Sequence, residues 1–426
     1  MGPWPCDVSA GSTRCLGSRA GAGRLALQHV PESRRERTSR YGKGSRYRVS
    51  GIPGVRDRSF ETLEDAKAWL RRSSTDQERG DFVDPRDGSI LLEDYVQRFW
   101  FPSMTGSVKT RQNQSRKVLL HVLPHLGQVP LRDINAARLR AYISDPEKTC
   151  SPQYARAILG ALSNIFETAI DDKRLTRNPM RARSVRWPKA DDVRREAWPL
   201  ETARRMRDSV NDRYRITVVL GVGCGLRQGE AFGLSPEDID YERGVLYVRR
   251  QVQSFCGRLY FALPKGGKTR VADMPASVAH ELRKHSEKYP AVEVELPWGE
   301  PGKPTVKVLL LLTTRFGNAV AVNTYNTYVW KPALARIGVI PPQPAGAKPW
   351  QWKAAHRDGF HVLRHTYASV VLEAGESVVT LARWLGHSSS VITLRNYAHF
   401  MPEAGGRGRR AIDGLLGDPA NPVVEN

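Results

Sequence analysis

The segment at residues 360–369 reads FHVLRHTYAS and holds two histidines and an arginine in close succession. His361, Arg364 and His365 stand at positions i, i+3 and i+4, a spacing that places them on one face of a helix. A helix that presents a guanidinium group beside imidazole rings is suited to binding a phosphate. The two histidines also suggest zinc, but Val362 stands where the H-E-x-x-H motif needs Glu, so a metal site is not expected.

A second segment, residues 384–400, reads WLGHSSSVITLRNYAHF. It places His387 directly after a Leu-Gly turn, and Tyr397 follows ten residues later. A single tyrosine at such a position usually belongs to a core or an interface. The segment therefore indicates a functional site only when it is considered together with the first one.

A third segment, residues 221–234, reads GVGCGLRQGEAFGL. Arg227 follows its glycine-rich bend, and Glu230 lies one helical turn further on. An arginine at this place can be presented to a phosphate while the glutamate orients it. Taken alone, the pair fits an ordinary surface ion pair equally well.

A fourth segment, residues 263–270, reads LPKGGKTR and offers Lys265 and Lys268 at an expected strand turn. Its GGKT resembles the end of a phosphate-binding loop for nucleotides. The leading glycine of G-x-x-x-x-G-K-T would fall at Ala262, however, so nucleotide binding is not expected.

In this order and spacing, the four segments resemble the signature motifs of the tyrosine recombinase family, to which phage integrases and chromosome-dimer resolvases belong. The resemblance covers roughly residues 200–411, and the helical region before them looks like the core-binding domain of the family. It implies a set of catalytic residues: the first arginine is Arg227, the His-x-x-Arg pair is His361 and Arg364, the histidine of Leu-Gly-His is His387, the hairpin lysine is Lys265 with Lys268 as the alternative, and the nucleophile is Tyr397.

The chemistry explains why these residue types are needed. A phosphodiester attacked in line by a hydroxyl passes through a five-coordinate phosphorus with extra negative charge, which two guanidinium groups can bind without a metal. We expect Arg227 and Arg364 to do this, with Glu230 supporting them. The roles expected of the other residues are attack by Tyr397, proton removal from it by His361, protonation of the departing 5′ oxygen by Lys265, and a hydrogen bond from His387 to a nonbridging oxygen.

In the family, this attack leaves a 3′-phosphotyrosine and a free 5′ hydroxyl, so rejoining needs no ATP. No cofactor and no metal are therefore expected. The expected function is site-specific recombination that integrates or excises a phage or mobile element. Two alternatives stay open: a type IB topoisomerase-like enzyme, which uses nearly the same residues, and a catalytically silent DNA-binding protein of the same fold.

Charge and composition agree with a nucleic-acid partner. The 426 residues include 66 Lys and Arg against 44 Asp and Glu, which gives a net charge of +22 and a pI near 10.0. Such a surface favours a polyanion through phosphate contacts and counterion release. The longest apolar run, residues 216–226, is far shorter than the ~20 residues that span a bilayer, so a membrane partner is not expected. Five scattered cysteines without C-x-x-C spacing indicate reduced thiols in a cytoplasm: Cys6, Cys15, Cys150, Cys224 and Cys256.

The chain is long enough for about three domains of ~150 residues. Turn residues and hydrophobic periodicity predict a multidomain fold with a small β-plus-α module, a helical domain and a mixed α+β domain. The resemblance implies that these are an arm-binding module, an all-α (SAM-like) core-binding domain, and a mainly helical catalytic domain of the DNA breaking-rejoining fold. The expected divisions are a disordered leader at 1–38, the arm-type module at 39–75, the core-binding domain at 88–180, a basic linker at 181–198, the catalytic domain at 199–411 and a tail at 412–426.

The resemblance also implies partners. Family members bind double-stranded attachment sites and pair two duplexes in a homotetramer. The arm-like module points to a phage or mobile-element integrase, which implies a host DNA-bending protein and an excision factor as further partners. The sequence of the attachment site and the preferred direction of recombination do not follow from these motifs.

Overall fold

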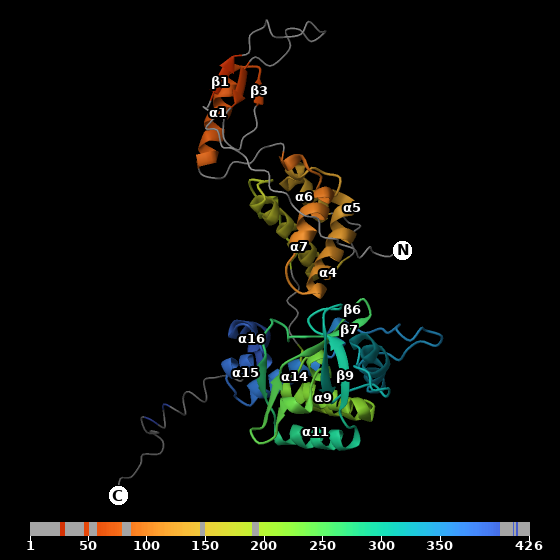
Figure 1. The fold of residues 1–426 in the computed structure, drawn as a ribbon. Helices are drawn as coiled ribbons and strands as arrows, with labels where there is room; N and C mark the ends of the chain where they lie inside the picture. The colour runs from red at the N-terminus through yellow and green to blue at the C-terminus, as the bar shows by residue number, and fades with distance from the viewer. Residues whose placement is uncertain are drawn as a thin grey trace. The chain divides into compact units, whose positions relative to one another are not determined.

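The structure is a computed structural model that describes residues 26–29, 47–50, 58–78, 87–144, 150–189 and 196–400, together with Ile412 and Leu415. These residues fall into two compact units. One comprises residues up to 191 and the other residues from 192 onward, with residues 106–110 grouped with the second. Figure 1 follows the chain from red at the N-terminus to blue at the C-terminus.

The first unit opens with a small module of three strands and a helix. Strands β1 (Ala26–His29), β2 (Tyr47–Ser50) and β3 (Arg58–Phe60) form an antiparallel sheet in that order, and α1 (Leu63–Glu78) follows. The core of the module is Val49 and Ala66, with four partly buried side chains packed against it: Tyr47, Phe60, Trp69 and Leu70. Thr62 caps α1, because its hydroxyl accepts a bond from the Asp65 amide at 3.1 Å.

This module differs from the prediction at both ends. Strand β1 lies inside residues 1–38, so the expected disordered leader is wrong for Ala26–His29, which pair with β2. Helix α1 continues to Glu78, beyond the expected end of the module at residue 75. The rest of residues 1–38, residues 190–195 and most of the tail at 412–426 lie outside the described residues.

The rest of the first unit is helical, as expected. Its elements are η2 (Asp87–Ser89), α2 (Leu92–Tyr95), η3 (Val96–Trp100), α3 (Phe101–Ser103), α4 (Val108–Lys117), η4 (Val118–Val122), α5 (Leu123–Leu126), η5 (Leu131–Asp133), α6 (Ala136–Ser144), α7 (Pro152–Asp171) and η6 (Pro179–Arg181). Helix α7 begins at a Ser151 cap with Pro152 in its first turn. It buries one face at helical spacing, with Ile158, Leu162 and Ile165 in the core.

Proline explains the π-helical turns of the structure. In η3, η4 and η8 (Asn326–Trp330), the residue after the turn bonds five residues back, and the next residue is Pro102, Pro124 or Pro332. A proline has no N–H and its ring crowds the carbonyl four residues earlier. Widening the preceding turn lets the helix continue through the proline.

The second unit is a mixed α+β domain. Its helices are α8 (Leu200–Ser209), α9 (Asp212–Cys224), α10 (Gln228–Phe232), α11 (Ala276–Lys288), α12 (Val322–Tyr325), η8, α13 (Lys331–Arg336), α14 (His361–Glu373), α15 (Val378–Leu385) and α16 (Ser390–Tyr397), with the short turns η7 (Pro236–Asp238), η9 (His356–Asp358) and η10 (Ala398–Phe400). Its strands are β4 (Ile239–Asp240), β5 (Val245–Val248), β6 (Gln251–Phe255), β7 (Arg258–Ala262), β8 (Arg270–Asp273), β9 (Val292–Pro297) and β10 (Thr305–Leu310).

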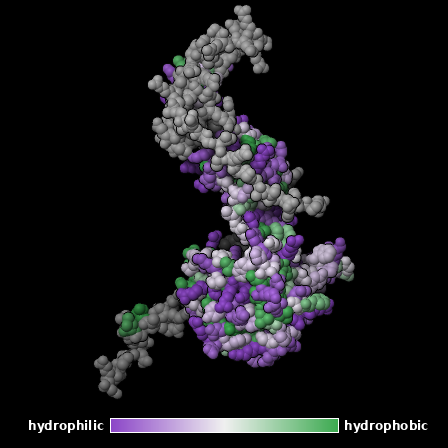
Figure 2. Space-filling view, viewed as in Figure 1, coloured by the Kyte–Doolittle hydropathy of each residue, from purple (hydrophilic) through white to green (hydrophobic). Residues whose placement is uncertain are grey.

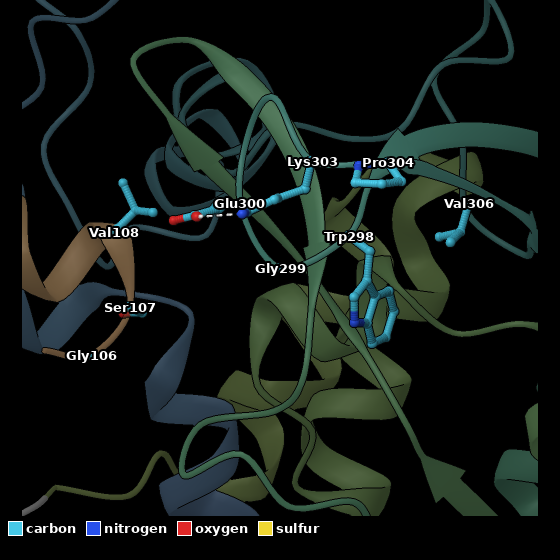
Figure 3. Close-up of a pocket in the computed structure, with 9 residues that line it drawn as sticks. All are labelled: Gly106, Ser107, Val108, Trp298, Gly299, Glu300, Lys303, Pro304 and Val306. Carbon is cyan, nitrogen blue, oxygen red and sulfur yellow. Dashed lines mark ion pairs between the residues drawn. The ribbon is translucent and has the colours of Figure 1, made fainter. Parts of the chain in front are cut away.

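The strands make three small antiparallel sheets rather than one. One sheet has the order β4-β5-β8, and the other two are the hairpins β6-β7 and β9-β10. The β9-β10 hairpin was not predicted. Charged and apolar residues alternate along it, and it lies after the stretch of the sequence in which strands were expected. At its tip, Glu300 pairs with Lys303 at 3.8 Å, beside Trp298 (Figure 3).

Helix α9 lies in the centre of this unit and brings the later motifs to the first. Gly221 allows α14 to pack closely, since a Cβ there would lie 2.7 Å from Leu363 Cδ1. Gly225 ends the helix in the left-handed conformation with φ of 63°. This turn sends the chain directly into Arg227.

The described residues contain no helix long and apolar enough to cross a membrane. On the face shown in Figure 2, hydrophilic residues cover most of the second unit, and apolar residues form small patches between them. Scattered patches of this size are usual for a protein surface.

The turn at Gly225 gives a stability prediction. In Gly225→Ala, the new Cβ would lie 2.6 Å from Tyr367 Cδ1 and 2.9 Å from Leu385 Cδ2 at a positive φ. We expect a loss of about 2–5 kcal/mol of unfolding free energy from left-handed strain and overpacking combined. Urea unfolding measures it. Gly257→Ala is the control, since its φ is also positive, at 77°, but no described atom beyond its chain neighbours lies within 4 Å. Equal losses in both variants would contradict the packing argument.

Candidate active site

The first site element is the start of α10, where Arg227 and Glu230 form a closed pair. The Glu230 carboxylate accepts the Arg227 backbone N–H at 2.8 Å and the Arg227 Nη1 at 2.8 Å. A glutamate at the third position of a helix caps its start in this way. The cap fixes both the backbone and the guanidinium of Arg227, whose other donors have no bonded partner among the described residues.

The same carboxylate binds a second arginine, which the sequence analysis missed. Arg270, at the start of β8, donates Nη1 to Glu230 Oε1 at 2.8 Å and Nη2 to Oε2 at 2.6 Å. Its Nε donates to the carbonyl of Trp384 at 2.8 Å, near the end of α15. A fork of two parallel bonds is the strongest form of an arginine-carboxylate pair.

Arg364, on α14, lies beneath these residues. It is 1% exposed, and its two Nη atoms donate to the carbonyls of Gly225, at 2.7 Å, and Leu385. Its Nε has no hydrogen-bond partner among the described residues. A buried N–H without a partner costs about 1–3 kcal/mol, so the burial of this arginine lowers the free energy of unfolding.

The electrostatics of the cluster favour an anion. Burial alone would raise the pKa of Glu230, but the hydrogen bond and charge of Arg270, together with the charges of Arg227 and Arg364, hold it at about 2. Burial, and then the charge of Arg227, lower the pKa of Arg364 to about 9, which still leaves it protonated at neutral pH. The charges of three guanidinium groups therefore act on one carboxylate, and the net charge of the cluster is positive.

His387 follows the left-handed Gly386 that ends α15, and its amide bonds back to the Ala382 carbonyl at 3.0 Å. Its Nδ1 lies 2.7 Å from the hydroxyl of buried Thr393. Burial, and then the nearby charges of Arg364, Arg227, Arg270 and Lys265, lower the pKa of His387 to about 4. The imidazole is therefore neutral at physiological pH.

Tyr397 ends α16 and is buried, with 2% of its surface exposed. Its ring lies nearly parallel to that of His387, with 6.5 Å between centroids, and packs in an apolar cluster that includes Leu381 and Leu385. Its hydroxyl lies 2.7 Å from Nδ1 of His365. The histidine beside the phenol is thus His365, the residue that follows Arg364.

Two of the predicted residues lie further out. His361 is exposed, and its ring meets that of His365 edge to face with centroids 4.8 Å apart. Lys265 is exposed in the turn between β7 and β8, where the Gly267 amide bonds to the Pro264 carbonyl at 2.9 Å. The structure thus groups Arg227, Glu230, Arg364, His387 and Tyr397, with His361 and Lys265 at the edge.

Sequence reasoning missed the contacts of Arg270 and His365 for different reasons. The helical spacing already placed His365 on the face of Arg364, but its partner Tyr397 is 32 residues away. Arg270 gave no signal beyond an arginine at the start of a strand. Within the part of the chain that the structure describes, no three His, Cys, Asp or Glu side chains are grouped as metal ligands.

Two family models match this chain. The model of the phage integrase family matches residues 200–403, and that of the phage integrase central domain matches residues 94–184. A tyrosine recombinase XerC-like protein of Caldanaerobacter subterraneus subsp. tengcongensis is 28% identical over 269 residues, which cover 59% of this chain and 64% of the relative. A putative prophage phiRv2 integrase of Mycobacterium tuberculosis is 24% identical over 351 residues, which cover 81% of this chain and 85% of the relative.

Among solved structures, a lambda integrase tetramer bound to a Holliday junction is similar. The TM-score is 0.53 at 18% sequence identity, covering 85% of this chain and 94% of that chain. A likeness at this identity shows the fold. It agrees with the multidomain fold expected from the sequence.

The depressed pKa of His387 gives a prediction for the free protein. An NMR titration of histidine-labelled protein should find one imidazole that titrates near pH 4, and His387→Asn should remove that signal. Because the unfolded chain keeps the ordinary value of 6.5, the stability that neutral His387 permits is present above pH 6.5 and is lost as the pH falls toward 4. A His387 signal that titrates at 6 or above would contradict the buried, positively charged surroundings.

Proposed function

Because the chain belongs to the phage integrase family of tyrosine recombinases, we propose that it is a site-specific recombinase that cuts and rejoins duplex DNA through a covalent link to Tyr397. The observation that carries this proposal is the meeting of four sequence motifs in one positive cluster beside that tyrosine. Arg227, Arg364 and His387 come from three different segments. Arg364 bonds the Gly225 carbonyl two residues before Arg227, the charges of both arginines act on His387, and the His387 ring lies nearly parallel to the ring of Tyr397.

The cluster suits a phosphate under attack. A phosphodiester carries one negative charge, and more accumulates as the phosphorus becomes five-coordinate. Arg227 is partly exposed and keeps donors that no described residue binds, so it can reach a nonbridging oxygen, while buried Arg364 adds charge from below. The Nδ1 of His387 bonds the Thr393 hydroxyl, and we assign neutral His387 the tautomer in which Thr393 donates, so that Nε2 carries the proton and presents it to a second oxygen.

The phenol needs a proton acceptor, since its ordinary pKa is near 10. We assign this role to His365, whose Nδ1 is 2.7 Å from the Tyr397 hydroxyl, whereas the sequence had suggested His361. As the bond from the tyrosine oxygen to phosphorus forms, the proton passes to the imidazole. The bond from phosphorus to the 5′ oxygen breaks in the same step, which leaves a 3′-phosphotyrosine.

The departing 5′ oxygen takes its proton from a lysine. We propose Lys265 rather than Lys268, because the charge of Lys265 is among the main ones that lower the pKa of His387. An exposed lysine on a glycine-containing turn has the reach for this transfer. Rejoining is the reverse reaction on a new 5′ hydroxyl.

The partners proposed are two duplex DNA attachment sites and three further copies of the chain. The net charge of +22 supports a DNA partner, and the similar lambda integrase is a tetramer on a Holliday junction. The prophage relative supports a phage or mobile element as the substrate. The separate sheet-and-helix module supports a second kind of DNA site, and with it a host DNA-bending protein and an excision factor. We propose that this reaction takes place in the cytoplasm.

The test of the nucleophile is covalent trapping. Wild-type protein and Tyr397→Phe are incubated with a nicked suicide duplex that carries the element's own attachment core, and the products are run on a denaturing gel. We expect a slowly migrating protein-DNA adduct with wild type and none with the variant, because the variant lacks the attacking oxygen.

The matched control is Tyr367→Phe, since Tyr367 packs in the same apolar cluster as Tyr397 and is also buried. This variant loses a hydroxyl from the same core and should still form the adduct. No adduct from folded, DNA-bound wild type would leave a silent DNA-binding protein, and relaxation of plasmid without the core would favour a topoisomerase.

The assignment of the proton acceptor is tested by two histidine variants. We expect His365→Asn to slow single-turnover adduct formation by roughly 10²–10⁴-fold, the usual contribution of a general base. His361→Asn should cost at least ten times less, because its ring is exposed and it is His365 that lies within bonding distance of the Tyr397 hydroxyl. A larger loss in His361→Asn than in His365→Asn would return the role to His361.

A further inference from the structure

The arginine at the start of β8 is the last residue of the fourth segment, and the sequence analysis gave it no role. We propose that Arg270 is a positioning residue that fixes Arg227 for phosphate binding and joins it to the turn that carries His387. This inference rests on the proposed recombinase function.

The contacts of Arg270 reach two motifs at once. Its fork binds both oxygens of Glu230 at 2.8 and 2.6 Å, and Glu230 in turn holds the backbone and side chain of Arg227. Its Nε binds the Trp384 carbonyl at 2.8 Å, three residues before His387. One guanidinium group thereby connects the first arginine to the Leu-Gly-His turn.

The stem of Arg270 strengthens the second connection. Gly386 packs so closely that a Cβ on it would lie 2.6 Å from Arg270 Cδ. The side chain of Arg270 is only 7% exposed, so its place is set on all sides by protein. Its charge also lowers the pKa of His387, which keeps that imidazole neutral.

Arg270 does not need to touch DNA for this role. All of its described bonds go to Glu230 and Trp384, so it acts through Arg227 and His387. If it is removed, Glu230 keeps one arginine instead of two, and Arg227 loses the rigid carboxylate that orients it. Arg227 should then neutralise the phosphate less well, while the surfaces that bind DNA should stay unchanged.

Arg250 provides a matched comparison in the same unit. It also forks onto a buried carboxylate, with bonds to Asp238 at 2.7 and 3.3 Å, and it is 11% exposed. Its bonds go to Asp238 and the Gly233 carbonyl, and none goes to Glu230, Arg227 or the turn that carries His387. Arg250→Met therefore has the structural cost of losing such a pair without the proposed effect on the phosphate.

The experiment compares two suicide substrates that differ at the scissile position. One carries the normal phosphodiester, and the other a methylphosphonate, which is neutral because a methyl group replaces one charged oxygen. A defect in neutralising the phosphate matters less on the neutral substrate. A general loss of structure slows both substrates equally.

We expect Arg270→Met to slow single-turnover adduct formation by about 100-fold on the phosphodiester and by less than about 5-fold on the methylphosphonate, in line with the usual effect of losing one oxyanion donor. DNA affinity should change little. Arg270→Lys, which keeps the charge but not the fork, should show a smaller loss with the same dependence on substrate. Arg250→Met should show no such dependence.

Equal losses on both substrates would overturn the inference and leave Arg270 a purely structural residue. If Arg270→Met does not fold, Arg270→Lys decides by the same ratio. Failure of wild type to form an adduct on either substrate would instead contradict the proposed function itself.

Discussion

The buried carboxylate of Glu230 is the constraint on which the site depends. A charge with almost no access to water is tolerable only when it is paired and hydrogen-bonded, and Glu230 accepts four bonds from two arginines. To supply them, the start of α10 and the start of β8 must meet at one place, and Arg270 also bonds the Trp384 carbonyl near the end of α15. The surrounding helices and small sheets can be understood as the scaffold that makes this meeting possible.

This arrangement also explains how like charges are kept together. Arg227, Arg270 and Arg364 repel one another, which is part of why the pKa of Arg364 falls to about 9. Glu230 offsets some of this repulsion, and the carbonyls of Gly225 and Leu385 hold Arg364 in place. The remaining imbalance is favourable for function, because a phosphate completes the charge of the cluster rather than competing for it.

The sequence alone predicted the family, the mixed α+β fold and the residues at the centre of the site, because these depend on local spacing. His361, Arg364 and His365 follow a helical period, and Arg227 and Glu230 form a helix cap. Spacing says nothing of partners far apart in the chain, so the bonds of Arg270 to Glu230 and of His365 to Tyr397 could not be predicted. Strand β1 was missed because its partner β2 lies about 20 residues later, beyond a stretch that is polar and rich in arginine.

The burial of Tyr397 has a consequence for fidelity. Tyr397 is 2% exposed, so in the proposed reaction its hydroxyl must first become accessible before it can attack a phosphodiester. Exposing the hydroxyl takes free energy, which only a well-fitting complex can supply. Discrimination between correct and incorrect DNA can then be greater in the rate of breakage than in the strength of binding, as in enzymes that assemble their active site on the right substrate.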